Sequence, residues 1–277
     1  MGDKPRFSTL FILGLGHSGS TLLGRMLACH PDVAYPGELL RLEQALNSPE
    51  QQCFCGELVS ECAAWRQRVQ LLPQGVKEDC RHWDLELLDR VRTAEGKAVL
   101  VDSSKSRVLR LKSKWRSPQV GYVLLVRDPR GAMRTALKQN KDLSSLLKTN
   151  RKWMRRYEVF ARNNPQVCLT MFYEDLVSTT ERELRRLCEF VGLNFSEAML
   201  HPNEQPFHLI RASRSPFLKG AGGFKLDERW RSELTPEQIR TIEHQLGGIS
   251  IYKNRYGFSR PTIGESWKAF FTGSVDS

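Results

Sequence analysis

Continuous apolar runs alternate with helical patterns along this chain. A strand that is covered on both faces of a parallel sheet is apolar throughout, and four such runs occur, at residues 7–14, 98–101, 120–126 and 167–172. A shorter extended piece, Val33 to Tyr35, lies between the first two. Strands that alternate with helices are typical of βαβ units. We therefore predict a three-layer α/β fold, with a central parallel sheet and helices on both faces.

Apolar residues that recur every three or four positions predict the helices between these strands. The predicted helices span residues 20–29, 38–46, 82–94, 106–116, 143–162 and 180–191, and another begins at Pro129. Thr235 to Gln238 is a capping box with proline at the first helical position, so a further helix begins there and ends at Gly247. The last 25 residues show no clear period.

We expect one domain over residues 1–277. Residues 47–82 form a cysteine-containing insertion in it. Residues 201–226 form a long loop with several glycine and basic residues, which is a candidate lid over an anion. The alternative is a solvated loop without a role.

The charge of the chain favours an anionic ligand. There are 42 Lys+Arg residues against 31 Asp+Glu, a net charge of +11. Nucleic acid is disfavoured as the partner, because the basic residues are spread over several predicted helices and form no stripe with aromatic residues. No apolar run approaches the ~20 residues of a membrane span, and residues 1–6 enter the first strand without a signal-peptide core. We expect a soluble, cytoplasmic protein.

The chain has seven cysteines, and we expect reduced thiols because a chain of this size needs no disulfides to fold. Cys53, Cys55 and Cys62 lie close together, with Cys80 and His82 further on. A C-x-C pair with a third cysteine is compatible with zinc, but the common structural zinc sites use C-x-x-C pairs. A structural or redox thiol cluster is therefore favoured over zinc, and we predict no metal ligand.

A glycine-rich turn follows the first strand and opens onto a helix. Its glycines allow the conformations of a tight loop, and a helix N-terminus favours an anion. Gly14, Gly19 and Thr21 match the phosphate loop G-x-x-x-x-G-K-[ST], but Ser20 replaces the lysine. This change argues against an ordinary kinase or NTPase. A kinase-like phosphotransferase that has lost its lysine remains the alternative, and a nucleic-acid-binding protein is a weaker one.

Polar residues follow three other predicted strands. Glu38 lies just past the extended piece at Val33, residues 102–105 close the strand at 98–101, and Arg127 closes the strand at 120–126. The carboxyl ends of parallel strands meet at one edge of a sheet, which is where open α/β sheets bind ligands. We expect these residues to converge there.

With these residues in place, the sequence resembles the sulfotransferases that use 3'-phosphoadenosine 5'-phosphosulfate (PAPS), and their bacterial and Golgi-type branch more than the cytosolic branch. Gly16 to Leu23 is similar to the family's 5'-phosphosulfate loop, R-S-G-[ST]-[ST]-L, and residues 126–135 are similar to its 3'-phosphate motif. Phe172 to Leu176 is similar to the family's Y-E-D-L, and Glu189 to Leu193 to its E-F-L-G-L. The resemblance covers most of the chain.

The resemblance implies transfer of a sulfuryl group from PAPS to a hydroxyl or amine of a small-molecule or carbohydrate acceptor. It implies that Arg127 and Thr135 hold the 3'-phosphate, with threonine where serine is usual. No metal is needed, because loop N–H groups and a few cations can carry the charge of the donor. The implied donor-binding residues are His17, Ser18, Gly19, Ser20, Thr21, Leu22, Arg127, Thr135 and Tyr173.

Three residues are implied to take part in the chemistry. Glu38 is the candidate base, since related sulfotransferases carry a glutamate at that place; the alternative is a charge at a helix N-terminus. Lys105 is the candidate cation for the sulfuryl oxygens; the alternative is a surface lysine. His17 stands where the family has arginine or lysine, and a histidine is charged only when protonated. We therefore expect turnover to fall at alkaline pH.

Overall fold

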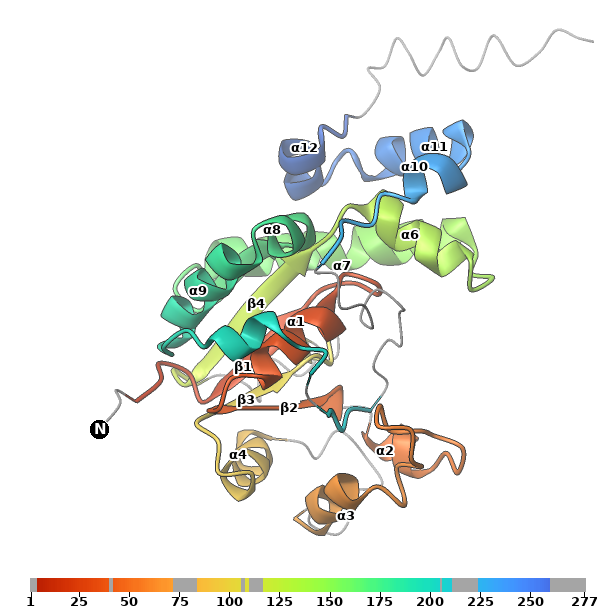
Figure 1. The fold of residues 1–277 in the computed structure, drawn as a ribbon. Helices are drawn as coiled ribbons and strands as arrows, with labels where there is room; N and C mark the ends of the chain where they lie inside the picture. Colours follow the sequence, from red (N-terminus) through yellow and green to blue (C-terminus); the bar gives the residue numbers. More distant parts are fainter. Residues whose placement is uncertain are drawn as a thin grey trace, which may run out of the picture. The chain divides into compact units, whose positions relative to one another are not determined.

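A computed structural model gives the structure of the chain (Figure 1). It describes residues 4–39, 42–71, 84–105, 108–109, 117–204, 206–210 and 224–259. These residues divide into two compact units, one of Met1–Arg127 with Ala161–Leu226 and the other of Asp128–Phe160 with Asp227–Ser277. The single domain expected from the sequence stays a prediction.

The first unit contains a five-stranded sheet in the order β2-β3-β1-β4-β5, in which every neighbouring pair is parallel. This confirms the predicted α/β fold with a central parallel sheet. All five carboxyl ends therefore lie at one edge. The strands are β1 (Thr9–Leu13), β2 (Val33–Gly37), β3 (Val99–Asp102), β4 (Val120–Val126) and β5 (Cys168–Phe172).

Both faces of β1 to β4 are buried, which is why these strands are apolar without alternation, whereas the edge strand β5 is partly buried. On β1, Leu10 and Ile12 belong to the core between the sheet and α1, α8 and α9, and both are fully buried. Phe11 and Leu13 alternate with them on the opposite face and are also fully buried. The apolar run of β1 therefore follows from its central place in the sheet.

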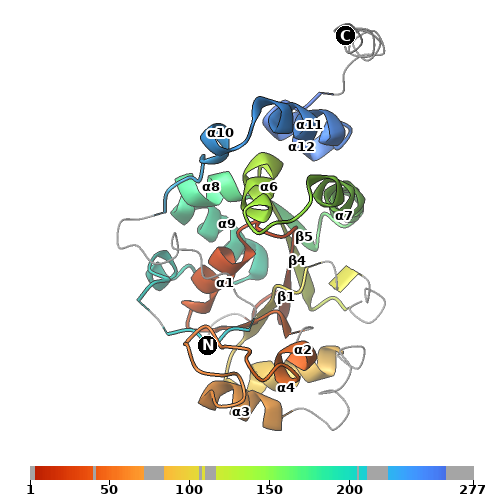
Figure 2. The same ribbon diagram turned by 90° about the vertical axis from the view of Figure 1, so that its right-hand side faces the viewer.

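One helical layer of this unit consists of α1, α8, α9 and the short 3-10 helix η4, which contact one another in pairs; Figure 2 shows α1 and α9 on the same side of the strands. Helix α4 packs instead on β3. Helix α3 was not predicted, because Trp65 is its one buried residue and a single buried position gives no helical repeat of apolar residues. The bounds are α1 (Ser20–Ala28), α2 (Leu42–Leu46), α3 (Ala63–Gln70), α4 (Leu85–Ala94), α8 (Tyr173–Ser178), α9 (Thr180–Val191) and η4 (Glu197–Leu200).

The second unit is helical. The buried Arg134 pairs with Glu233 at 2.5 Å, and Tyr252 donates a hydrogen bond to Asn150 at 3.0 Å. The predicted capping box at Thr235 is present. The last helix was missed because its short length gives no readable period. The bounds are α6 (Pro129–Leu137), α7 (Leu143–Asn163), which runs into the first unit, α10 (Trp230–Glu233), α11 (Pro236–Leu246) and α12 (Ser250–Tyr256).

Candidate active site

The loop between β1 and α1 is shaped by a glycine with a left-handed backbone. Gly19 precedes the helix with φ 92°, and a Cβ there would lie 2.6 Å from the ring of Tyr173. Both the conformation and the space therefore require glycine. The first N–H groups of the nine-residue helix have no partner within it, so the loop presents donors and the positive end of a helix dipole to an anion.

Ser18 offers a buried hydroxyl at this loop. Its side chain is 3% exposed, and its Oγ has no hydrogen-bond partner among the described residues. A buried polar atom without a partner costs about 1–3 kcal/mol, which a phosphate or sulfate oxygen would offset. The loop residues therefore fit an anionic donor. Leu22 contributes differently: its side chain is buried in the core, so only its backbone can face a ligand.

Arg127 contacts two other predicted donor-binding residues, His17 and Tyr173. It follows β4, and its Nη1 donates a hydrogen bond to the backbone oxygen of His17 at 2.9 Å. Its guanidinium carbon lies 4.4 Å from the ring centroid of Tyr173, at the start of α8. Residues from the ends of β1, β4 and β5 thus meet at one point. Their role in binding a donor stays a prediction.

Thr135 lies on α6 in the second unit. Its hydroxyl donates to the backbone oxygen of Gly131 at 3.1 Å, one helical turn earlier. Its joint action with Arg127 on a 3'-phosphate stays a prediction.

Glu38 and Lys105, the two residues predicted to act on the transferred group, form an ion pair. Lys105 Nζ lies 2.5 Å from Glu38 Oε1, and the two side chains are 22% and 11% exposed. They come from the ends of the neighbouring strands β3 and β2. Lys105 is therefore not a solvated surface lysine. The catalytic roles of both residues stay predictions.

His17 and Lys105 also share an unusual backbone conformation. Their φ angles are 64° and 57°, and in the described part of the chain one other non-glycine residue, Asn140, has a positive φ. Such conformations cost energy and persist where the surroundings enforce them, often at functional sites. The structure thus constrains the backbone at two of the three residues expected to do chemistry.

Asp102 organises the Glu38–Lys105 pair, a role that the sequence did not reveal. Its Oδ2 accepts hydrogen bonds from Leu39 N at 2.7 Å and Ser104 Oγ at 3.0 Å, and its Oδ1 accepts one from Ser104 N at 2.7 Å. The carboxylate thereby joins the residue after Glu38 to the residue before Lys105. Complete burial raises the pKa of Asp102 to about 6. The only sequence signal was a carboxylate at a strand end.

The segment 206–210 lies against the end of β2. Ile210 forms a parallel bridge with Gly37, and a Cβ on Gly37 would lie 2.8 Å from the Ile210 oxygen. This segment belongs to the loop that the sequence identified as a possible lid. Half of that loop, residues 211–223, lies outside the described residues, as do Cys80 and His82. Lys225 is described and exposed.

A family model described as "Sulfotransferase family" matches residues 9–197. Among curated proteins, the chain is 24% identical over 259 residues to protein-tyrosine sulfotransferase 1 of Danio rerio, covering 87% of this chain and 66% of that protein. It covers about half of the length of other protein-tyrosine sulfotransferases that it matches.

Two solved structures share the fold. The sulfotransferase domain of the Synechococcus PCC 7002 olefin synthase superposes with a TM-score of 0.62 at 24% identity, covering 88% of this chain and 97% of that one. Mouse sulfotransferase SULT7A1 complexed with PAP superposes with a TM-score of 0.50 at 14% identity, covering 95% and 88% of the two chains.

The predicted cytoplasmic location is wrong. The curated relatives are protein-tyrosine sulfotransferases, which are Golgi membrane enzymes. The expectation rested on the lack of a long apolar run and of a signal-peptide core, and neither feature determines a compartment. None of the helices in the described residues is long and apolar enough to cross a membrane.

Proposed function

The chain belongs to the sulfotransferase family, and we propose that it transfers the sulfuryl group of PAPS to a hydroxyl or amine of an acceptor. The meeting of Arg127, His17 and Tyr173 at the glycine loop carries this proposal. It places a guanidinium beside a helix N-terminus, an arrangement suited to a donor with two separate anionic groups.

We assign the 5'-phosphosulfate to the loop from His17 to Leu22. The buried hydroxyl of Ser18 and the N–H groups at the start of α1 would bind its oxygens. Ser20 stands where a triphosphate-binding loop has lysine. A sulfuryl donor has no terminal phosphate for such a lysine to reach, so this difference supports PAPS over ATP.

We assign the 3'-phosphate to Arg127, assisted by the hydroxyl of Thr135. A guanidinium recognises phosphate through charge-assisted, often bidentate, hydrogen bonds. Stacking on Tyr173 orients the Arg127 side chain before the donor arrives. The cost of ordering this long side chain is thus partly met in the free protein.

Transfer needs a base for the acceptor and positive charge near the sulfuryl group. An acceptor oxygen or nitrogen attacks the sulfur, its proton passes to Glu38, and the bond from sulfur to the phosphate oxygen breaks. Lys105 would move from Glu38 to the sulfuryl oxygens, and a protonated His17 would stabilise the charge that develops on the phosphate. The N–H groups of α1 act on that same phosphate.

The ion pair between Glu38 and Lys105 supports this division of work. At 2.5 Å each side chain holds the other in the free protein, and the Asp102 carboxylate fixes both backbones. An acceptor hydroxyl that binds Glu38 separates the pair and releases Lys105. We therefore assign the chemistry to the ends of β2 and β3, and donor binding to the loop from His17 to Leu22, which we call the donor loop.

The acceptor class is tested with donor labelled with sulfur-35. The full chain is incubated with the donor and with a tyrosine peptide, a carbohydrate, a simple phenol and an amine, and labelled product is separated from donor. We expect transfer to at least one of them, and its loss in Glu38→Gln. If no acceptor is labelled while labelled phosphate from ATP appears on one, the kinase-like alternative replaces this proposal.

A further inference from the structure

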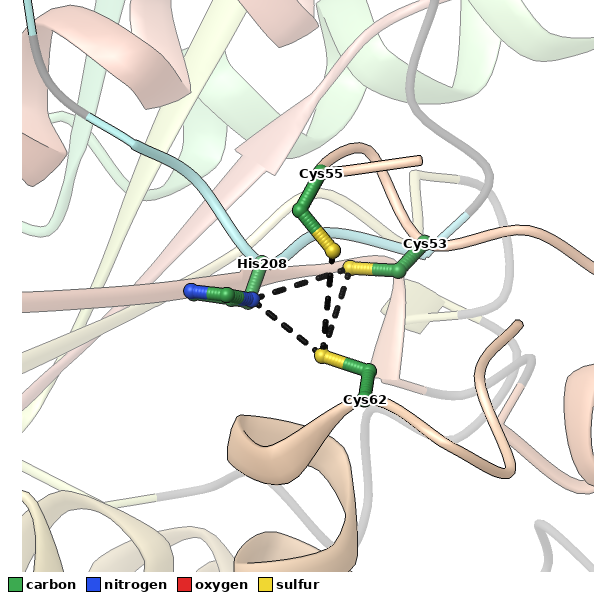
Figure 3. A group of neighbouring side chains, drawn as sticks. All are labelled: Cys53, Cys55, Cys62 and His208. Atoms are coloured by element: carbon green, nitrogen blue, oxygen red, sulfur yellow. Dashed lines mark hydrogen bonds between the residues drawn. The ribbon is translucent and has the colours of Figure 1, made fainter. Parts of the chain in front are cut away.

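Three cysteines and one histidine of the first unit, none of which has a role in the site assigned above, converge on one point. The sulfur atoms of Cys53, Cys55 and Cys62 and a ring nitrogen of His208 all lie within 4.8 Å of one another. Figure 3 shows the three sulfurs and Nδ1 of His208 turned toward a common centre, while the other ring nitrogen points away from it. We name these four residues the Cys3His cluster.

The distances within the Cys3His cluster fit a tetrahedral metal. Cys62 Sγ lies 3.8 Å from Cys53 Sγ and 3.9 Å from Cys55 Sγ. His208 Nδ1 lies 3.2 Å from Cys62 Sγ and 4.0 Å from Cys53 Sγ. Zinc bonds of about 2.3 Å to sulfur and about 2.0 Å to nitrogen place tetrahedral ligand atoms about 3.5–3.8 Å apart. A disulfide would require about 2.05 Å between sulfurs.

Hydrogen bonds of the backbone hold three of the four ligands in place. Within the cysteine loop, Cys53 N donates to Glu57 O at 2.8 Å and Cys62 N donates to Leu58 O at 2.9 Å. Around the histidine, the backbone oxygen of His208 accepts from Arg68 Nη1 at 2.7 Å. The cluster is thus organised by contacts that do not involve its own side chains, as a metal site with fixed geometry requires.

The burial of the ligands also suits a metal. Cys53 and Cys62 are fully buried, His208 is partly buried and Cys55 is exposed. The inner side of the cluster is therefore dry, and an ion can enter beside Cys55.

We propose that Cys53, Cys55, Cys62 and His208 bind one Zn²⁺ as a closed structural site. Three thiolates and one imidazole form a common structural zinc ligand set, and four protein ligands leave no open position for catalysis. Iron–sulfur clusters use four cysteines, or two cysteines with two histidines. The preference for a thiol cluster rested on the C-x-C spacing, but the fourth ligand lies 146 residues beyond Cys62.

The Zn²⁺ would fix the segment that contacts the end of β2. His208 lies two residues before Ile210, which bridges Gly37, the neighbour of Glu38. Phe54 N also donates to Leu209 O at 3.0 Å. The ion would thereby tie the cysteine loop to the strand end that carries the proposed base, which gives it a structural role near the acceptor and none in holding the donor.

The direct test is the metal content of the full chain, purified with reductant and without chelator. Elemental analysis should find about one zinc per chain. Cys55→Ser is the informative variant, because Cys55 is exposed and its replacement leaves no buried gap. We expect the zinc affinity of this variant to fall at least about 100-fold. Cys29→Ser, which changes a buried cysteine outside the cluster, is the matched control and should retain its zinc.

A second measurement does not depend on the folding of any variant. A mercurial reagent added to the unmodified chain should release one zinc as the cluster thiols react, and a chelator should lower the melting temperature of that chain. The proposal is overturned if the chain neither contains nor takes up stoichiometric zinc, if it holds iron or copper instead, or if Cys55→Ser binds zinc as tightly as the parent.

Discussion

The donor loop and the Cys3His cluster both concentrate polar atoms near the carboxyl ends of the strands, but they are built in opposite ways. The loop uses the backbone of consecutive residues, and it depends on Gly19 having no side chain. The cluster uses side chains from two segments that are far apart in sequence. Changes in the loop should therefore alter ligand affinity, whereas changes in the cluster should alter folding.

Glu38 tests this comparison most strongly, because it belongs to neither region: it pairs with Lys105 and follows Gly37, which bridges Ile210 near the cluster. Glu38→Gln keeps the shape but removes the base, so turnover should fall about 10²–10⁴-fold while donor affinity stays within a few-fold. Steady-state rates and donor titration of the same preparation measure both quantities. Near-parental turnover would show that Glu38 is only structural.

Arg127 tests whether the loop acts through affinity. Arg127→Ala removes the proposed partner of the 3'-phosphate and should weaken donor binding by about 2–4 kcal/mol, measured by calorimetry. Arg90→Ala is the control, because the Arg90 side chain is 55% exposed and, within the described part of the chain, forms its ion pair with Glu86. If the donor affinity of Arg127→Ala equals that of the parent, Arg127 does not bind the 3'-phosphate.

Gly19 is the exception in the donor loop, because its substitution should lower the stability of the fold and not only the affinity for the donor. Gly19→Ala places a Cβ 2.6 Å from Tyr173 at a positive φ, so the free energy of unfolding should fall by about 2–4 kcal/mol. At Gly16 a Cβ would meet nothing within 4 Å, and Gly16→Ala should stay within about 0.5 kcal/mol of the parent. Urea unfolding measures both variants, and equal stabilities would contradict the packing described here.

Asp102 should give the protein a pH dependence of its own. Burial raises its pKa to about 6, above the value of about 3.9 in an unfolded chain. The folded state therefore holds this proton to higher pH, and the Asp102 contribution to the free energy of unfolding falls by about 2–3 kcal/mol as pH rises from about 4 to about 6. Above that range it stays low. The difference in the free energy of unfolding between the parent and Asp102→Asn should change with pH in this way. Parallel plots of the two free energies against pH would contradict this prediction.

Thr135 should have the smallest effect. Thr135→Ala removes one hydroxyl from the proposed 3'-phosphate site and should weaken donor binding by about 1 kcal/mol, less than Arg127→Ala. Thr180→Ala is the control, because the Thr180 hydroxyl also donates to a backbone oxygen, that of Val177, three residues earlier. If the donor affinities of the two variants are equal, a contact between Thr135 and the donor is excluded.

The donor loop could be predicted from the sequence because its information is local. Strand, glycines and helix follow one another, and parallel strands bring Arg127 and Tyr173 to the same edge by topology alone. The same reasoning placed Glu38 and Lys105 at neighbouring strand ends, where the structure pairs them.

The Cys3His cluster could not be predicted in this way. Nothing in the sequence around His208 connects it with cysteines 146 to 155 residues earlier, and the contact depends on the path of segment 206–210 at the end of β2. The bonds of Asp102 to Leu39 and Ser104 were missed for the same reason, because they depend on the register of two strands. Helix α3 lacks a period because its position rests on few buried side chains.

The measurement that tests the central claim most directly is calorimetry of the unmodified chain with 3'-phosphoadenosine 5'-phosphate and, separately, with adenosine 5'-phosphate. The two ligands differ only in the 3'-phosphate that we assign to Arg127. We predict one binding site per chain and at least about 30-fold tighter binding of the ligand that carries the 3'-phosphate. Equal affinities, or tighter binding of ATP than of either ligand, would contradict a PAPS-dependent sulfotransferase site at this loop.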